Sequence, residues 1–414
     1  MSDSLLYDWN QVGPATAELS RPERVELNDE TLRDGLQSPS VRQPSIDEKE
    51  QFLRLMPRLG IGAADLGYPG ASDSAYADVV RLARLIQQER LPLAANCAGR
   101  THIADLTPIM RASQEAGVAI EAALFLGSSA IRQSIEGWNL AKLLHTIEQA
   151  IGTAHREGLA VMFVTEDTTR ARPDDLKAMY LAAAEAGATR FCVADTVGHA
   201  TPVGAQRVVR FVADVLREGG FRPVLDWHGH RDRGLDVINS LAALAAGASR
   251  VHGCALGMGE RVGNTPMDTM LVNLVLLGWI DQDLTALPEY CRLASSVTGV
   301  QIPRNYPVTG EDAFSTSTGV HAAAVSKAYA KGETGLADIV YSSVPASLVG
   351  RRQEILIGPM SGRSNVEYWL RQHGVDPTPK RVEAVMNAAK TTRQVLSPEQ
   401  IVRVLASLET PLGA

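Results

Sequence analysis

Two histidines separated by one residue, His228 and His230, end a hydrophobic segment that begins at Pro223. In an extended strand, side chains at positions i and i+2 point to the same face. Two imidazoles on one face of a strand tip can share a divalent metal ion if an oxygen ligand lies nearby. Asp34, which follows another strand-like segment near the start of the chain, is a candidate for that ligand.

These residues can meet only if the fold brings the ends of distant strands together. Along the first part of the chain, helix-like segments end in glycine, as at Gly117 and Gly187, and a short apolar segment follows at once. Glycine ends helices readily, and continuously apolar strands are typical of a parallel sheet covered on both sides. The segments predicted as strands span residues 25–32, 63–69, 91–99, 118–125, 159–167, 189–196, 223–230 and 249–257.

Eight alternating strand and helix units predict an α/β fold, the (β/α)8 TIM barrel. An open, doubly wound sheet is the alternative, but it usually carries a glycine-rich fingerprint after its first strand, and none is present here. Residues 1–285 are therefore expected to form the barrel, 286–310 a linker, and 311–414 a small helical C-terminal domain. Helices of that last domain are predicted near residues 319–331, 363–374, 378–391 and 397–408.

The composition excludes several classes of protein. Of the 414 residues, 45% are hydrophobic and 21% charged, which provides a large core and argues against disorder. The formal charge of −7 argues against nucleic acid as a partner. Four widely spaced cysteines are typical of reduced thiols, and no apolar segment is long enough for a membrane span. Because the first residues show no secretion signal, a cytoplasmic protein is expected.

In barrels of this kind, the chemistry is built at the carboxyl ends of the strands and in the loops that follow. Polar candidates fall at those positions along the chain, namely Arg33, Asp34, Gln37, Asp65, Glu166, Asp167, Asp195, Thr196, His228, His230 and Asn264. The first, seventh and eighth strands are neighbours in a closed barrel. One metal ion is therefore expected to be bound by Asp34, His228, His230 and Asn264.

Some of these residues also have an ordinary structural interpretation. A lone histidine is usually a hydrogen-bonded structural residue, although the paired spacing of His228 and His230 favours a metal site. Arg33 is a candidate for substrate contact, but it could instead be the ion-pair partner of Asp34 or Glu166. Asp65 is either a charge that supports the site or the N-cap of a helix.

In the loop after the eighth strand, Glu260 and Arg261 either pair with each other and stiffen the loop or contact substrate. Most other histidines are assigned to structural or surface roles, namely His102, His145, His155, His199, His252 and His373. The four cysteines show no pattern that indicates chemistry: Cys97, Cys192, Cys254 and Cys291.

Taken together, the motifs resemble those of the DRE-TIM metallolyases. They occur in the family's order and cover nearly the whole barrel: Asp29-Glu-Thr-Leu-Arg-Asp-Gly-Leu-Gln37, Thr165-Glu-Asp-Thr168, Asp195-Thr-Val-Gly-His-Ala-Thr-Pro202, His228-Gly-His230 and Gly257-Met-Gly-Glu-Arg-Val-Gly-Asn264. Within the family, the chain is similar to the Claisen-condensing branch of isopropylmalate, homocitrate and citramalate synthases. Its strand-eight loop has no cysteine, and its tail contains synthase-like segments around residues 310–321 and 361–364.

This resemblance implies a reaction between acetyl-CoA, or a related acyl-CoA, and a 2-oxo acid. A divalent ion (Mg, Mn or Zn) held by Asp34, His228 and His230 would bind the keto oxygen and carboxylate of the 2-oxo acid. Arg33 would stabilise the developing alkoxide, and Thr196, with Gln37 and Asp65, would contact the substrate. His321 would be the base, assisted by Tyr341 and Glu166. The resemblance also implies a homodimer whose C-terminal subdomains reach the partner's barrel.

Departures from the family's patterns keep alternatives open. With Leu36, the first motif has the sequence found in lyases that cleave 3-hydroxy-3-methylglutaryl-CoA. Asp65 replaces a typical Glu, and His199 replaces a Tyr. The end of strand four, residues 122–129, lacks a histidine that is frequent in the family. A lyase running the reverse cleavage is therefore the main alternative; a metal-dependent hydrolase and a non-catalytic binding protein are the others. Without a long regulatory domain, no leucine feedback is expected.

Overall fold

The computed structural model describes residues 19–409, which form two compact units that divide after Gln301. Each unit is described by itself. The segment that was expected to show no secretion signal lies outside the described residues. Among the residues that are described, no helix has both the length and the apolarity needed to cross a membrane.

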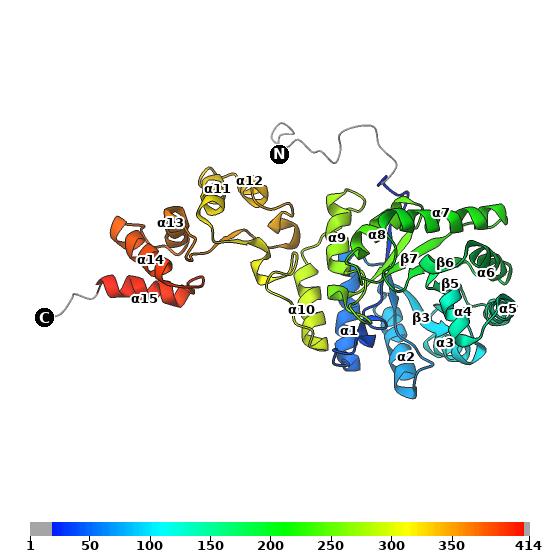
Figure 1. Cartoon of the computed structure of the whole chain (residues 1–414). Coiled ribbons are helices and arrows are strands. Elements are labelled where there is room, and N and C mark those ends of the chain that lie inside the picture. Colours follow the sequence, from blue (N-terminus) through cyan, green and yellow to red (C-terminus); the bar gives the residue numbers. More distant parts are fainter. Residues whose placement is uncertain (1–18, 410–414) are drawn as a thin grey trace. The chain divides into compact units, whose positions relative to one another are not determined.

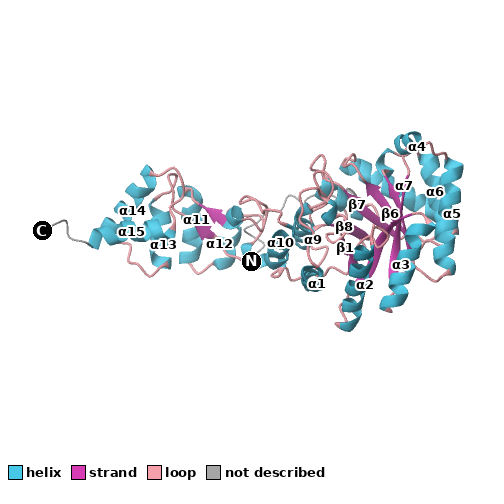
Figure 2. Ribbon diagram, turned by 90° about the horizontal axis from the view of Figure 1, so that it is seen from below, coloured by secondary structure: helices cyan, strands magenta, loops and turns pink. Residues whose placement is uncertain are grey.

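The first unit contains a closed barrel of eight parallel strands, which confirms the predicted TIM barrel (Figures 1 and 2). The ring closes because β1 pairs with β8 as well as with β2. Each predicted strand segment overlaps one observed strand. The strands are β1 (Glu26–Asp29), β2 (Ala63–Asp65), β3 (Ala94–Arg100), β4 (Ile120–Gly127), β5 (Val161–Glu166), β6 (Arg190–Asp195), β7 (Leu225–Gly229) and β8 (Arg250–Gly253).

Helices surround the strands, and every α-helix of this unit except the short α4 (Ala130–Glu136) buries apolar residues on the outside of the barrel (Figure 2). Their ends follow the sequence signals: Ser45 and Glu48 form a capping box at the first helix, and Gly117, with φ +67°, ends the third. The helices are α1 (Ile46–Leu55), α2 (Asp73–Gln88), α3 (Ile103–Ala116), α4 (Ala130–Glu136), α5 (Leu140–Arg156), α6 (Pro173–Glu185), α7 (Pro202–Glu218), α8 (Asp236–Ala245), α9 (Met267–Leu276) and α10 (Leu287–Thr298).

Helix α10 lies within the segment that was expected to be a linker. It buries Leu287, Tyr290, Cys291, Ala294 and Val297, which recur at the spacing of one helix face. The Tyr290 hydroxyl donates a hydrogen bond to the buried carboxylate of Asp29 on β1. This helix therefore belongs to the barrel unit, because its apolar face and its buried tyrosine both pack there.

The second unit, which begins at Ile302, contains the four helices predicted for the tail, together with shorter elements that the sequence did not reveal. Two small hydrophobic clusters hold it together, one around Ala322 and Val325 and another around Trp369 and Leu370. Its elements are β9 (Ser315–Thr316), α11 (Gly319–Ala330), α12 (Thr334–Ile339), β10 (Glu354–Ile355), α13 (Arg363–Gln372), α14 (Pro379–Thr391) and α15 (Pro398–Glu409). The missed elements span six residues or fewer, too few for a periodic pattern.

Candidate metal centre and active site

Three predicted ligands meet at the carboxyl ends of β1 and β7. The Nε2 atoms of His228 and His230 are 3.2 Å apart and lie 3.4 and 3.6 Å, respectively, from Oδ2 of Asp34. All three residues are buried. Two ligands that each lie about 2.1 Å from one ion are separated by about 3 to 3.5 Å, so this spacing suits a single divalent cation.

The local chain path explains why these residues converge. His228 lies in β7 and His230 follows it in extended chain, so both rings turn toward one side. Asp34 comes after β1, in the turn that leads into a short 3-10 helix, Gly35–Gln37. Only β8 separates β1 from β7 around the ring, which brings together side chains almost 200 residues apart in sequence.

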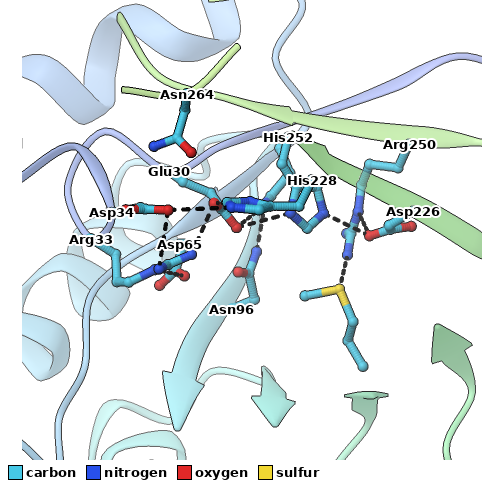
Figure 3. Close-up of polar contacts among 12 residues, drawn as sticks. Glu30, Arg33, Asp34, Asp65, Asn96, Asp226, His228, Arg250, His252 and Asn264 are labelled. Carbon is cyan, nitrogen blue, oxygen red and sulfur yellow. Dashed lines mark hydrogen bonds and ion pairs between the residues drawn. The ribbon is translucent and has the colours of Figure 1, made fainter. Parts of the chain in front are cut away.

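Asn264 follows β8 and forms an isolated bridge with His230. Its side-chain NH2 donates to the carbonyl of Met258 at 3.1 Å, which orients the amide and leaves Oδ1 buried without a hydrogen-bond partner. The Asn264 amide faces the group that contains Asp34 and His228 (Figure 3). A buried acceptor without a partner is costly, so this oxygen fits a further ligand position.

The His230 ring is in a suitable protonation state for metal binding. Burial, together with the neighbouring His228, lowers the pKa of His230 to about 4. The His230 ring is therefore neutral at neutral pH, as a metal ligand must be. Its Nδ1 is buried and has no partner among the described residues.

Glu30 is one of two residues of this site whose role could not be predicted from the sequence; His252 is the other. One of its oxygens lies 2.8 Å from Nδ1 of His228 and 2.9 Å from Nη2 of Arg33, while the other lies 2.9 Å from Nδ1 of His252 (Figure 3). A carboxylate this close to Nδ1 favours the tautomer with the proton on that nitrogen, which leaves the lone pair of Nε2 available to a metal. Glu30 is thus placed to set the tautomer of His228.

His252, assigned from the sequence to a structural or surface role, is buried and lines the pocket floor. It also contacts Asp226, with Nε2 to Oδ2 at 2.9 Å, and Arg250 donates to the same carboxylate oxygen at 2.6 Å. Burial alone would lower the pKa of His252, but the Glu30 and Asp226 carboxylates outweigh it and raise the pKa to about 9. The protonated ring joins Glu30 to Asp226.

A second group of ligand-type residues, Glu30, His228 and His252, is also compact enough to hold an ion. It shares His228 with the first group, so the two cannot be filled together. Because His252 is protonated between two carboxylates, it offers no lone pair to a metal. The group of Asp34, His228 and His230 is therefore the better candidate.

Arg33 lies beside the metal group and is surrounded by carboxylates. Its Nε donates to Asp65 at 2.9 Å, and its Nη1 lies 3.5 Å from Asp34. The ion pair with Glu166 considered above is not formed, because Glu166 lies 3.0 Å from Arg132 instead. Asp65 caps no helix, since Ser72 is the N-cap of α2. Buried and absent from the pocket lining, Asp65 is placed to hold Arg33 rather than to contact substrate.

A cavity of about 230 Å³ opens above these residues. Gln37, Thr196 and Glu166 line it, as the sequence predicted for residues at strand ends. The Thr196 hydroxyl accepts a hydrogen bond from the Asp167 N–H at 2.8 Å, which leaves its own hydrogen free to donate. Burial raises the pKa of Glu166, even though Arg132 partly offsets the effect.

The loop after β8 forms one side of the cavity. Glu260 and Arg261 both line it, but they are not each other's ion-pair partners. Arg261 instead binds Asp232 with its Nε at 2.8 Å and donates to the carbonyl of Thr196 at 2.7 Å. The loop is thereby tied to the ends of β6 and β7.

The predicted base, His321, and its predicted assistant, Tyr341, belong to the second unit. Their rings lie against each other, with centroids 4.0 Å apart, and both side chains are exposed. The residues that line the barrel cavity all belong to the first unit. The metal and substrate candidates are therefore gathered in the barrel, whereas the base candidates form a separate exposed pair.

We predict that Glu30→Gln weakens binding of a divalent metal by about 10- to 100-fold, because the amide no longer holds the proton on Nδ1 of His228. Calorimetric titration of the metal-free protein with Mn2+ or Zn2+ measures the change. Glu121→Gln is the matched control, since Glu121 pairs with Arg250 inside the barrel and does not touch His228. Equal affinities in the two variants would show that Glu30 does not orient the ligand.

A second prediction concerns stability and pH. The folded-state pKa of His252, about 9, exceeds its ordinary value of 6.5, so its stabilising contribution is fully present below pH 6.5 and is lost as pH rises through 9. In the presence of chelator, His252→Gln should lower the free energy of unfolding by up to about 3 kcal/mol at pH 6 and by much less at pH 9.5. Denaturant unfolding at both pH values measures this; the same loss at each would contradict a protonated His252.

The chain is similar in sequence to two named synthases. The chain is 33% identical to a probable 2-isopropylmalate synthase of Methanopyrus kandleri, over 89% of this chain and 70% of that protein. It is 30% identical to a homocitrate synthase of Methanocaldococcus jannaschii, over 93% of this chain and 90% of that protein.

Among solved structures, a hydroxymethylglutaryl-CoA lyase of Pseudomonas aeruginosa is similar with a TM-score of 0.56 and 20% identity, over 67% of this chain and 93% of that one. That likeness shows the barrel fold alone. The family described as HMGL-like matches residues 24–297, most of the chain. The resemblance to the DRE-TIM metallolyases is thus confirmed, and the chain belongs to the HMGL-like family.

Proposed function

We propose that the chain is a metal-dependent acyltransferase that condenses an acyl-CoA, acetyl-CoA first of all, with a 2-oxo acid. The observation that carries the proposal is the buried group of Asp34, His228 and His230, whose ligand atoms lie within 3.6 Å of one another at the mouth of a barrel. Relatives that are named as 2-isopropylmalate and homocitrate synthases support this type of reaction.

Asp34, His228, His230 and Asn264 would hold the ion. When bound, a divalent cation would act as a Lewis acid on the keto group of the 2-oxo acid. One carboxylate, two imidazoles and one amide oxygen form a set between hard and soft ligands, which suits Mg, Mn or Zn. The buried, unpartnered Oδ1 of Asn264 supports this use of the site.

The remaining residues of the barrel would bind and orient the 2-oxo acid. The free hydroxyl hydrogen of Thr196 is available to a substrate carboxylate, and Gln37 offers an amide at the rim of the cavity. Arg33 lines the cavity beside the metal group and is held there by Asp65 and Glu30. Its fixed guanidinium would stabilise the negative charge that develops on the keto oxygen.

The reaction needs a proton acceptor as well. The methyl carbon of acetyl-CoA loses a proton and forms a bond to the keto carbon, whose oxygen becomes an alkoxide and then takes up a proton. Water next cleaves the thioester, which gives a carboxylic acid and the free thiol of CoA. We assign the first proton transfer to His321, which lies against Tyr341, with Glu166 as a further acid–base group in the barrel.

Because His321 and Tyr341 belong to the second unit, we propose a homodimer in which that unit serves the partner's barrel. The exposure of both rings supports the proposal, since the pair is free to meet another surface. The family's synthases, as the sequence resemblance implies, use their tails in this way.

Cleavage of a 3-hydroxy-3-methylglutaryl thioester is the second candidate function, favoured by the lyase-like sequence of the first motif around Leu36. The loop after β8 carries Glu260 and Arg261 rather than a cysteine at the cavity. Cys254 precedes that loop, but burial raises the pKa of its thiol well above the usual range, and it does not line the cavity. The lyase reaction is therefore the weaker candidate.

We predict that free thiol is released from acetyl-CoA only when a 2-oxo acid and a divalent metal are both present, and that chelator stops the release. A thiol-trapping assay over a set of 2-oxo acids, followed by mass identification of the product, measures this. Thiol release that ignores the 2-oxo acid would indicate a simple thioesterase. Rapid formation of a ketone product from 3-hydroxy-3-methylglutaryl-CoA, without any condensation, would favour the lyase.

The exchange of C-terminal units is tested by complementation between two inactive variants. His321→Ala should keep its metal and lose at least about 100-fold in turnover, and Asp34→Asn should lose metal and turnover. When the two variants are co-expressed, random pairing makes about half of the dimers mixed. Each mixed dimer has one intact active site out of two, so about a quarter of wild-type activity should return. If each tail served its own barrel, the mixture would stay inactive, and the exchange would be excluded.

A further inference from the structure

The wall of the cavity that faces the metal group is apolar. In the eight-stranded ring, β3, β4 and β5 lie across from β7, β8 and β1, which carry the metal candidates. The side chains that this wall contributes to the cavity are Tyr68, Ala98, Ala123, Phe125, Met162 and Val164. A 2-oxo acid whose carboxylate and keto oxygen are bound by an ion at Asp34, His228 and His230 would direct its side chain toward this wall.

The side chains of this wall lie at two depths in the cavity, a buried floor and an outer rim. Ala98, Ala123 and Met162 form the floor and are each less than 5% exposed. Phe125 and Val164 stand two residues further along the same strands and so face the same interior. Tyr68 meets Phe125 edge to face at the rim, with ring centroids 6.4 Å apart. Two alanines at the floor leave space, and the rings above enclose it with apolar surface.

No positive charge is available along this wall among the described residues that line the cavity. Two arginines lie near its strand ends, but both are engaged elsewhere. Arg100 binds the Asp105 carboxylate through two nitrogens, each at 2.8 Å, and Arg132 binds Glu166. Glu166 also brings a carboxylate of its own to the cavity. A second substrate carboxylate here would be desolvated without a cation and would face a like charge.

From this wall we infer that the substrate is a 2-oxo acid with a single carboxylate and an apolar side chain larger than methyl. The inference rests on the proposed condensation and specifies its substrate class. It excludes 2-oxo dicarboxylates, because their distal carboxylate would find no cation among the side chains that this wall contributes to the cavity. It also disfavours pyruvate, whose methyl group leaves the space above Ala98 and Ala123 unfilled.

The experiment compares kcat/KM for thiol release from acetyl-CoA across 3-methyl-2-oxobutanoate, 4-methyl-2-oxopentanoate, phenylpyruvate, pyruvate and 2-oxoglutarate. The best apolar substrate should exceed pyruvate by about 10-fold and 2-oxoglutarate by at least about 100-fold. If 2-oxoglutarate or pyruvate is the best substrate, this inference fails while the proposed condensation stands. If none of the acids supports thiol release, the proposed function itself fails.

Variants then test the wall directly. Ala98→Leu fills the space at the floor of the cavity. The ratio of kcat/KM for the best apolar substrate to kcat/KM for pyruvate should therefore fall by about 10-fold or more. Ala94→Leu makes the same change at the exposed start of β3 and should leave the ratio unaltered. Phe125→Lys, at the half-buried rim, should raise kcat/KM for 2-oxoglutarate relative to that for the apolar acids by at least about 10-fold. Unchanged ratios in both Ala98→Leu and Phe125→Lys would overturn the assignment of this wall.

Discussion

A network of buried carboxylates, each paired with a cation inside the barrel, is the constraint on which the site depends. Charges of this kind are stable away from water only when each is paired and hydrogen-bonded. The anions are Glu30, Asp34, Asp65 and Asp226, and the cations are Arg33, Arg190, Arg250 and protonated His252. These pairs form one connected network inside the barrel. Arg190 and Arg250, the first residues of β6 and β8, bind Asp226 on β7, and His252 joins Asp226 to Glu30. At the other end, Arg33 contacts Glu30, Asp34 and Asp65, and Glu30 lies against Nδ1 of His228, whose Nε2 faces Asp34.

Much of this arrangement could be predicted from the sequence. Apolar segments that follow helix-ending glycines indicated eight strands, and the closure of a barrel then placed Asp34 beside His228 and His230. Glu30 and His252 could not be found in the same way. Glu30 lies just beyond β1, where the alternation of side chains no longer applies, and His252 is a single histidine within a strand. Their roles depend on contacts across three strands, which no local pattern encodes.

The barrel and the second unit divide the proposed chemistry between them. The barrel supplies the ligand group, the arginine and an apolar wall, all preorganised by buried contacts, whereas His321 and Tyr341 stand exposed on a unit of their own. This division separates specificity from proton transfer. Substitutions along β3 to β5 would change which 2-oxo acid is accepted, and substitutions on α11 would change turnover while leaving metal binding intact.

We propose that one divalent ion binds to Asp34, His228 and His230 rather than to Glu30, His228 and His252. Cobalt(II) titration followed by visible absorption and X-ray absorption spectroscopy tests it most directly, with His230→Ala and His252→Gln as the paired variants. We predict one tightly bound ion with two imidazole nitrogens, lost in His230→Ala and still coordinated by two imidazoles in His252→Gln. Retention of the ion in His230→Ala together with its loss in His252→Gln would contradict this assignment of the ligands.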